Sequence, residues 1–243
     1  MNLLVIILLE LAKLKRTSIG MVIRKEKVGR AELYLADCMD LMKDYPDKSF
    51  DIAIVDPPYG GAGCDLWKGK KNTRFGGKFN RYNIDKNSLN WDCPPPEEYF
   101  NQLFRISKYQ VIWGGNYFAL PPTRNFLVWY KITIPENFSM AMAEYAWTNI
   151  PGNAKVFEYG ANGSKSKPRI HPTQKPVELY KWILSLYAKK GDKILDTHMG
   201  SGSLEVACIE LGFDVVGIEI NETYFNGALE RIKTANRQRR LFD

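Results

Sequence analysis

The segment Lys193–Glu219 reads KILDTHMGSGSLEVACIELGFDVVGIE, and it decides the fold. Lys193–Asp196 predicts a short buried strand, and a glycine loop, Gly200-Ser201-Gly202, follows it closely. The next residues predict a helix that ends at the C-cap residue Gly212, and Asp214–Glu219 predicts a second strand. A strand, loop, helix and strand in this order indicate an α/β fold with a parallel sheet.

The same segment carries the marks of a nucleotide-binding site. Gly200 and Gly202 allow the backbone to approach a ligand closely. Glu219 ends the second strand near the offset of roughly 20 residues at which an acid meets ribose hydroxyls. The third glycine of the dinucleotide fingerprint is absent, so a single adenosine-bearing cofactor fits better than NAD. Ser201 does not lie in a Gly-x-Ser-x-Gly elbow, which excludes serine hydrolase chemistry.

A second motif lies upstream, where the apolar run Ile52–Val55 is followed by Asp56-Pro57-Pro58-Tyr59. Ligands of open α/β sheets bind outside the carboxyl ends of the strands, and the two prolines hold an extended backbone there. The Asp56 carboxylate and the Pro57 carbonyl can accept the two hydrogens of an exocyclic amino group, while Tyr59 offers a face for base stacking. The alternative interpretation is a plain strand with a proline-rich turn.

Composition limits the classes of protein that the chain can represent. It has 243 residues, 45% hydrophobic and 25% charged, which is typical of a globular protein. Lys and Arg number 34 against 27 acidic residues, giving a net charge of +7 that favours a polyanionic partner. The four cysteines form no close pair and there are two histidines, so no metal site is predicted. We expect a reduced, cytoplasmic protein.

The first twenty residues form a separate question. The apolar run Leu3–Leu9 has no basic residue before it and is too short to span a bilayer. A signal peptide and a membrane anchor are therefore disfavoured. We expect residues 1–20 to be an extension outside the core, and residues 21–243 to form one domain.

The rest of the chain alternates between predicted strands and helices. Further strands are predicted at residues 32–35, 110–113, 126–130 and 142–148, and helices at 39–45, 97–106, 177–188 and 221–233. The tail after the last helix, Arg237–Arg240, is basic.

Two loop-like segments, residues 60–92 and 151–170, are rich in basic residues. The first also contains many glycines and five aromatic residues between Trp67 and Trp91. This composition suits phosphate contacts and base stacking, although a solvated mobile loop is the alternative. The candidate residues for contacts with nucleic-acid phosphates are Lys68, Lys70, Lys71, Arg74, Lys78, Arg81, Lys165, Lys167 and Arg169.

Together these motifs resemble the amino-directed DNA methyltransferases that use S-adenosylmethionine. The resemblance is to the circularly permuted group, in which the catalytic motif, here Asp56–Tyr59, precedes the cofactor loop, here Asp196–Ser203. His171–Pro176 matches the segment before that loop, and the wording of Trp113–Phe118 resembles the phage and prophage branch. The resemblance implies a Rossmann-like fold with a mostly parallel, seven-stranded sheet and insertions that recognise the target.

The resemblance also implies roles for individual residues. Asp56, Pro57, Pro58 and Tyr59 would hold the target base, and Asp37 and Cys38 would border the adenine of the cofactor. Glu219 would hold the ribose, Asp196, Gly200, Gly202 and Ser203 would line the methionine moiety with Asp56 nearby, and Thr173 with Lys175 would meet its carboxylate. Thr197-His198 departs from the Pro-Phe that the family often has, so no aromatic cofactor contact is expected there; we expect His198 to pack or to position the backbone.

Aspartate at the first position of the catalytic motif favours adenine N6 as the target, because relatives with serine there more often methylate cytosine N4. The resemblance thus implies direct methyl transfer to a flipped-out adenine in double-stranded DNA. Cytosine N4 and structured RNA are alternative targets, and a nucleic-acid-binding protein without catalysis is a further alternative. A second copy of the chain and a cognate restriction endonuclease are the other partners that the resemblance admits.

Overall fold

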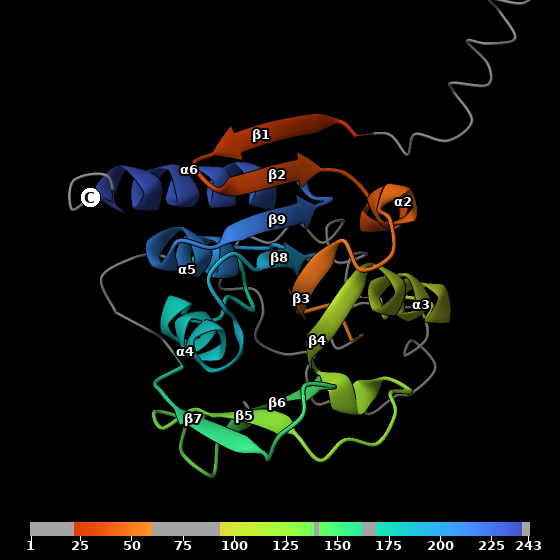
Figure 1. Ribbon diagram of the computed structural model, residues 1–243. Coiled ribbons are helices and arrows are strands. Elements are labelled where there is room, and N and C mark those ends of the chain that lie inside the picture. Colours follow the sequence, from red (N-terminus) through yellow and green to blue (C-terminus); the bar gives the residue numbers. More distant parts are fainter. Residues whose placement is uncertain (1–21, 60–92, 139–140, 162–168, 240–243) are drawn as a thin grey trace, which may run out of the picture.

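The fold is built on one continuous mixed sheet. The computed structural model describes residues 22–59, 93–138, 141–161 and 169–239. Within them, nine strands pair in the order β1-β2-β9-β8-β3-β4-β6-β5-β7 (Figure 1). Their bounds are β1 Arg24–Val28, β2 Ala31–Leu35, β3 Phe50–Val55, β4 Ser107–Trp113, β5 Phe126–Tyr130, β6 Ala143–Thr148, β7 Lys155–Glu158, β8 Lys193–Asp196 and β9 Asp214–Glu219. The predicted α/β, Rossmann-like class with a mostly parallel sheet is confirmed.

The predicted number of seven strands is wrong, because β1 and β7 add one strand at each edge of the sheet. β1 reads RKEKV and pairs antiparallel with β2, and only Val28 of its side chains is buried. β7 lies inside the segment 151–170 that was predicted as a loop, and it pairs in parallel with β5. Both strands lie at the edges and bury little, so neither carries the apolar pattern of a core strand.

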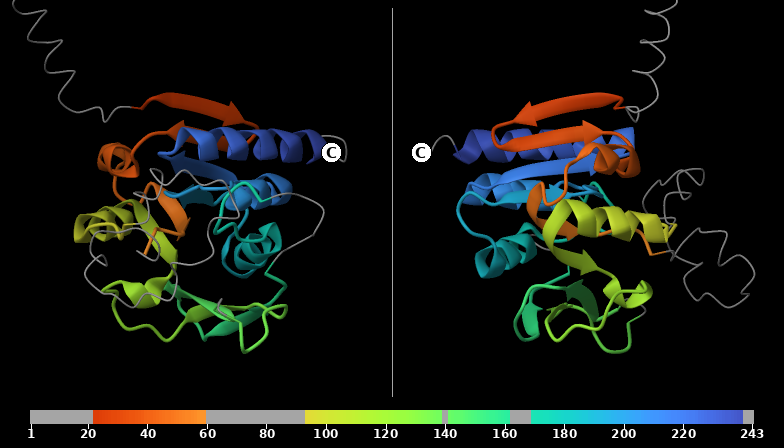
Figure 2. Two further views of the ribbon diagram at one scale, coloured as in Figure 1. Left: turned by 180° about the vertical axis from the view of Figure 1, so that it is seen from behind. Right: turned by 45° about the vertical axis from the view of Figure 1, so that its right-hand side comes forward.

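The helices of the described residues cover the two faces of the sheet, as Figures 1 and 2 show. They are α2 Cys38–Asp44, α3 Glu97–Ile106, α4 Val177–Tyr187, α5 Ser203–Leu211 and α6 Glu222–Arg239, and a short 3₁₀ turn, η4, spans Gly115–Tyr117. None of the described helices is both long and apolar enough to cross a membrane. The last helix was predicted to end at Lys233 but continues to Arg239, so most of the predicted basic tail is helical. Arg239 accounts for part of this extension, because its Nη1 donates to the Ile209 carbonyl of α5 at 2.6 Å.

The core divides into two clusters, one on each face of the sheet. Along β3, Ile52 and Ile54 belong to the cluster under α4, α5 and α6, whereas Ala53 and Val55 belong to the cluster under α2 and α3. This alternation follows from the two-residue period of a strand. Because β3 is buried on both faces, its sequence is an unbroken apolar run. Such a strand holds the residue that follows it, Asp56, at a fixed place.

The strands β2, β9, β8, β3 and β4 run parallel to one another, so their carboxyl ends meet at one edge. The residues that follow or end these strands include Asp37, Asp56, Gly114, Asp196 and Glu219. Four of these five were predicted as site residues. The topology therefore gathers on one edge the residues that the sequence places far apart.

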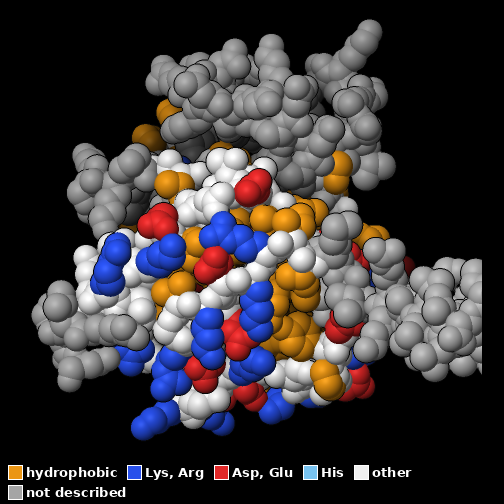
Figure 3. Space-filling view, turned by 90° about the horizontal axis from the view of Figure 1, so that it is seen from above, with side chains coloured by type: hydrophobic (Ala, Val, Ile, Leu, Met, Phe, Trp, Pro, Cys, Tyr) orange, Lys and Arg blue, Asp and Glu red, His pale blue; other side chains and the backbone are white. Residues whose placement is uncertain are grey.

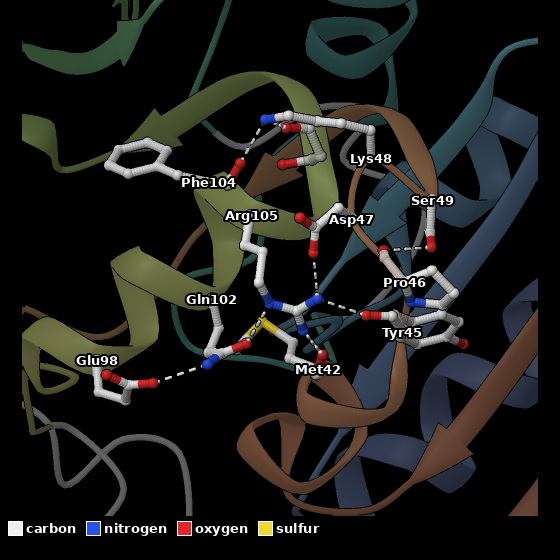
Figure 4. A network of polar contacts seen from close by, with 11 residues as sticks. Met42, Tyr45, Pro46, Asp47, Lys48, Ser49, Glu98, Gln102, Phe104 and Arg105 are labelled. Carbon is white, nitrogen blue, oxygen red and sulfur yellow. Dashed lines mark hydrogen bonds and ion pairs between the residues drawn. The ribbon is translucent and has the colours of Figure 1, made fainter.

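A polar clamp fixes the turn that leads into β3 (Figure 4). From α3, the Arg105 guanidinium donates to the carbonyls of Met42 and Tyr45 at 2.8 and 2.7 Å and to the Asp47 carboxylate at 2.9 Å. Lys48, which has a φ of 54°, donates in return to the Phe104 and Ser107 carbonyls at 2.7 and 2.9 Å. These bonds satisfy carbonyls at the ends of α2 and α3, where a helix has no internal donor to offer.

We expect Arg105→Met to lower the free energy of unfolding by about 2 kcal/mol, because carbonyls at a helix end and a carboxylate lose a charged donor. Arg124→Met is the matched control, since Arg124 is exposed. Chemical denaturation of the two variants measures the difference. Equal free energies of unfolding for the two variants would show that the hydrogen bonds of Arg105 do not stabilise the fold.

Candidate functional site

The site is centred on Asp56, which follows β3 at the carboxyl edge of the sheet. One oxygen, Oδ2, accepts a hydrogen bond from Lys175 Nζ in an ion pair. The other oxygen, Oδ1, is buried and has no hydrogen-bond partner among the described residues. A buried carboxylate oxygen without a donor is costly, so this atom marks a place where a ligand donor belongs.

Lys175 belongs to the segment that leads into α4, and its side chain is only 3% exposed. Its ammonium also lies 3.3 Å from Glu144 Oε2, and it sits 5.2 Å from the centre of the Trp113 ring. The other oxygen of Glu144, Oε1, lies 2.5 Å from Lys131 Nζ at the end of β5. Lys131, Glu144, Lys175 and Asp56 thus form one line of alternating charge, which we call the charge chain.

The protonation states of the charge chain follow from burial and from its own charges. Burial raises the pKa of Asp56, Lys175 lowers it, and Glu144 raises it further, so that the net direction is upward. For Lys175, burial lowers the pKa, but the charges of Asp56 and Glu144 outweigh burial and raise it. The two lysines likewise outweigh burial at Glu144 and lower its pKa. Lys175 therefore stays a cation beside Asp56.

Tyr59, the last residue of the motif, lies against the start of η4. Its ring stacks on Tyr117, with centroids 4.6 Å apart and an interplanar angle of 6°, and Tyr117 is 61% exposed. Gly114 passes so close that a Cβ built on it would lie 2.7 Å from Tyr59 Cδ1, and its φ is +68°. The glycine that follows β4 therefore makes room for the aromatic pair.

We expect Gly114→Ala to displace Tyr59 and to lower the catalytic rate by about 10- to 100-fold, because small misplacements at a site carry costs of that size. Gly191→Ala is the control, since Gly191 has a φ of +94° but nothing within 4 Å of its Cβ position. Both variants impose backbone strain, and only the first one meets a neighbour. Turnover rates of the two variants, compared at equal folded fraction, isolate the contact with Tyr59.

Asp196, at the end of β8, lies beside this site. Its Oδ1 accepts the backbone N–H of His198 at 3.0 Å, and burial, followed by the charges of Asp56 and Glu219, raises its pKa to about 8. His198 packs edge-on against Tyr99, and burial lowers the pKa of its imidazole to about 4. Thr197 bonds both side chains, with its Oγ1 2.7 Å from the Tyr99 hydroxyl and 2.9 Å from His198 Nδ1. These contacts agree with the predicted packing role of His198.

The glycine loop after β8 is fastened to Glu219 at the end of β9. Glu219 Oε2 accepts the Gly200 N–H at 2.8 Å, and Oε1 accepts the Asn221 N–H at 2.8 Å. Gly200 has a φ of +51°, and the nearest atoms to its Cβ position belong to the ring of His171, at 3.6 Å. Burial and the charge of Lys175 lower the pKa of His171 to about 4, so its ring is neutral at pH 7. Thr173, which is exposed, places its Oγ1 3.1 Å from His171 Nδ1.

The rest of the loop turns toward α6. Gly202 has a φ of +69°, and a Cβ there would lie 3.0 Å from Ala228 Cβ. Ser203 is buried, with its Oγ 3.0 Å from Ser201 Oγ, and the guanidinium of Arg231 donates to the Ser201 carbonyl and lies 3.3 Å from Ser203 Oγ. Ser203 is thus held by protein groups, and the structure places Gly202 at a helix contact.

Asp37 and Cys38 follow β2 at the same edge. Asp37 is exposed and caps α2 by accepting the Met39 N–H at 2.8 Å. Burial, with the charge of Asp37, raises the pKa of the Cys38 thiol to about 12, so it stays protonated. No group of three or more metal-ligating side chains occurs within the described residues.

Most of the predicted DNA-binding residues lie outside the described residues. These are Lys68, Lys70, Lys71, Arg74, Lys78, Arg81, Lys165 and Lys167. Arg169 is described, and it donates to the Ala161 carbonyl. On the face over β1 and α6, Lys and Arg alternate with Asp and Glu (Figure 3), and pairs such as Lys25–Glu32 at 3.0 Å and Lys233–Glu230 at 2.9 Å neutralise one another. The described part of that face therefore carries charges of both signs.

Three neighbours of Asp56 and Tyr59 were not predicted from sequence, namely Lys131, Glu144 and Tyr117. Glu144 lies in a predicted strand among apolar residues, and an acid at such a place was the one available signal. Tyr117 lies in the segment Trp113–Phe118 that was used only for the resemblance. Lys131 carries no local signal, because its partner lies on the neighbouring strand.

Comparisons with known proteins agree with this arrangement. Residues 66–230 match the family model for N6/N4 methyltransferases, described as DNA methylase, and the Asp56–Tyr59 motif lies just before the matched residues. The chain is 23% identical over 245 residues to the Type II methyltransferase M.HpaI of Haemophilus parainfluenzae, covering 82% of this chain and 73% of that protein.

Two solved structures share the fold. The crystal structure of the M1.HpyAVI–SAM complex superposes with a TM-score of 0.54 at 24% identity, covering 83% of this chain and 99% of that one. The PvuII DNA methyltransferase, described as cytosine-N4-specific, superposes with a TM-score of 0.52 at 12% identity, covering 88% and 96%. The family model matches more than half of the chain. This chain therefore belongs to the N6/N4 DNA methylase family.

Proposed function

We propose that this chain is a site-specific DNA adenine N6-methyltransferase of the permuted, phage-like branch, with S-adenosylmethionine as its methyl donor. The observation that carries the proposal is the buried, unpartnered Oδ1 of Asp56 at the carboxyl end of β3. An exocyclic amino group is the donor that fits it. The Pro57 carbonyl is the proposed acceptor for the second hydrogen of that amino group.

The strand ends beside Asp56 fit the cofactor. S-adenosylmethionine supplies a methyl group that is already electrophilic, because it is carried on a sulfonium cation. Asp196, whose pKa is raised by burial and by the charges of Asp56 and Glu219, is the group that would lie near that cation. Gly200, with its φ of +51°, keeps the loop free of a side chain there. The residues proposed to line the rest of the cofactor site are Glu219, Asp37, Cys38, Thr173 and Ser203.

The contribution of the chain to catalysis is orientation and electrostatics. Asp56 Oδ1 holds one amino hydrogen while Lys175 holds Oδ2, so that the nitrogen lone pair turns toward the methyl group. Tyr59 and Tyr117 supply aromatic surface on which the extruded base stacks. A base inside a duplex cannot reach this site, so the target nucleotide must be flipped out.

Adenine is proposed over cytosine because the first residue of the catalytic motif is an aspartate. The fold does not decide between the two bases, since a protein described as cytosine-N4-specific shares it. Cytosine N4 is therefore the second candidate. The basic residues between Lys68 and Arg81 and those at Lys165, Lys167 and Arg169 are proposed to contact DNA phosphates.

We also propose that residues 21–243 form one methyltransferase domain, to which residues 1–20 are not needed. A deletion variant lacking them should stay soluble and active. A second copy of the chain and a cognate restriction endonuclease are proposed partners, for which light scattering and co-purification are the direct measurements.

Sequencing of DNA from a methylation-free bacterial host that expresses this chain tests the proposal. N6-methyladenine in a fixed short context is the expected result. N4-methylcytosine would overturn the choice of base and keep the mechanism. No modified base in DNA, from a protein that still binds S-adenosylmethionine in calorimetry, would point to RNA as the substrate.

A further inference from the structure

The charge chain extends the site beyond the residues that touch a base or a cofactor. Lys131 follows β5, Glu144 lies in β6, Lys175 precedes α4 and Asp56 follows β3, so four separate segments contribute one charge each. The exposed fractions of the side chains are 7%, 24%, 3% and 18% in that order. Two cations and two anions alternate, so the four residues of the charge chain are neutral together.

Each residue of the charge chain restricts the position of the next one. Glu144 has two oxygens, and each one contacts a different lysine, at 2.5 Å and 3.3 Å. Lys175 is held between two carboxylates and lies over the Trp113 ring, and Lys131 lies 5.0 Å from the centre of the Trp129 ring. With these partners, the Lys175 ammonium contacts Oδ2 of Asp56, and Oδ1 is left without a hydrogen-bond partner.

From this arrangement we infer that Glu144 and Lys131 are positioning residues for methyl transfer. Glu144 holds Lys175 against Oδ2 of Asp56, and Lys131 holds Glu144 in turn, so that Oδ1 alone stays open to the target amino group. The inference rests on the proposed function and goes beyond it, because neither residue touches the base or the cofactor. Their effect reaches the reaction through the orientation and the charge of Asp56.

The charge chain also affects the pKa of Asp56, so the inference predicts a measurable change in pH dependence. Glu144 raises the pKa of Asp56 and Lys131 lowers it. Removing one charge or the other should therefore move the ionisation of Asp56 in opposite directions. The other titratable groups that face Asp56 are Asp196 from β8, Tyr99 from α3, Tyr180 from α4 and Tyr59 from its own segment, and they are the same in all variants.

The test is the pH dependence of the single-turnover methylation rate of the full chain with duplex DNA. We expect Glu144→Gln and Lys131→Met each to lower the maximal rate by about 10- to 100-fold, because Lys175 loses its fixed position. In Glu144→Gln the acid limb of the profile should move to lower pH, and in Lys131→Met to higher pH, each by about one unit for a charge at this distance. The affinity for S-adenosylmethionine, measured by calorimetry, should stay unchanged.

Exposed residues provide matched controls. Glu136→Gln and Lys190→Met make the same chemical changes outside the charge chain, and neither should move the rate or the profile. The double variant Glu144→Gln/Lys131→Met removes one charge of each sign, so its acid limb should return to the wild-type position while its rate stays low. If a single variant does not fold, the rate and the acid limb of this double variant still test the inference.

Acid limbs that do not move, or that move in the same direction in both single variants, would show that the two residues only support the fold. A wild-type rate in a folded double variant would overturn the inference as well. If the wild-type chain itself transfers no methyl group to DNA, the proposed function fails and the inference fails with it. An active wild type with unmoved variants overturns the inference alone.

Discussion

Asp56→Asn is expected to abolish methyl transfer, with a loss of at least about 1000-fold in the single-turnover rate, while the fold and cofactor binding survive. The asparagine keeps the shape of the side chain but has no charge for Lys175 and only one acceptor oxygen. That oxygen must serve either Lys175 or the target amino group, whereas the carboxylate serves both. The measurement is methylation of duplex DNA, with thermal unfolding and calorimetry on the same samples.

Asp44→Asn is the matched control for this variant, because Asp44 is exposed on α2 and lies outside the site. It should be as active as the wild type. Asp56→Ala should be as inactive as Asp56→Asn but less stable, since it leaves Lys175 buried with Glu144 as its remaining partner. Full activity in Asp56→Asn would sink the assignment of Asp56 as the acceptor of the amino hydrogen.

The elements that sequence predicted well are those whose signal is local. The bounds of β8, β9 and α3 agree with the prediction. The apolar runs of β8 and β9 each end at an acid, and α3 begins directly after a run of prolines. β1 was missed because an edge strand with charged residues on both faces has no such pattern. β7 was missed because its four residues bury little and lie in a basic, loop-like segment.

The residues of the site divide in the same way, into those with a local sequence signal and those without one. Asp56, Asp196 and Glu219 were predicted because each one ends or follows an apolar strand, and parallel strands bring such residues to one edge. The charge chain was not predicted, since Lys131, Glu144 and Lys175 come from different segments and their pairing depends on the sheet order. Lys175 was expected to meet the cofactor carboxylate, but in the structure its ammonium contacts Asp56 and Glu144. Its role at the cofactor carboxylate stays a prediction.

The affinity for S-adenosylmethionine is expected to rise with pH between about 6 and 8, by up to about tenfold per unit, and to level off above 8. The reason lies in Asp196, whose pKa is raised to about 8 by burial and by the neighbouring charges of Asp56 and Glu219. Below that pH the free protein holds a proton on Asp196. A sulfonium cation favours the ionised carboxylate, so binding at pH 7 must release the proton, and this cost disappears as pH rises past the pKa.

S-adenosylhomocysteine provides the comparison that isolates this effect, because it has the same amino, carboxyl and adenosine groups but a neutral sulfur. Its affinity should change much less over the same pH range. Calorimetry at pH 7 in two buffers of different ionisation enthalpy should detect release of a proton with S-adenosylmethionine and little with S-adenosylhomocysteine. Asp196→Asn should flatten the pH profile and weaken S-adenosylmethionine more than its product. Parallel pH profiles for the two ligands would mean that Asp196 does not face the sulfonium, and the cofactor would then have to lie differently over the strand ends of β8 and β9.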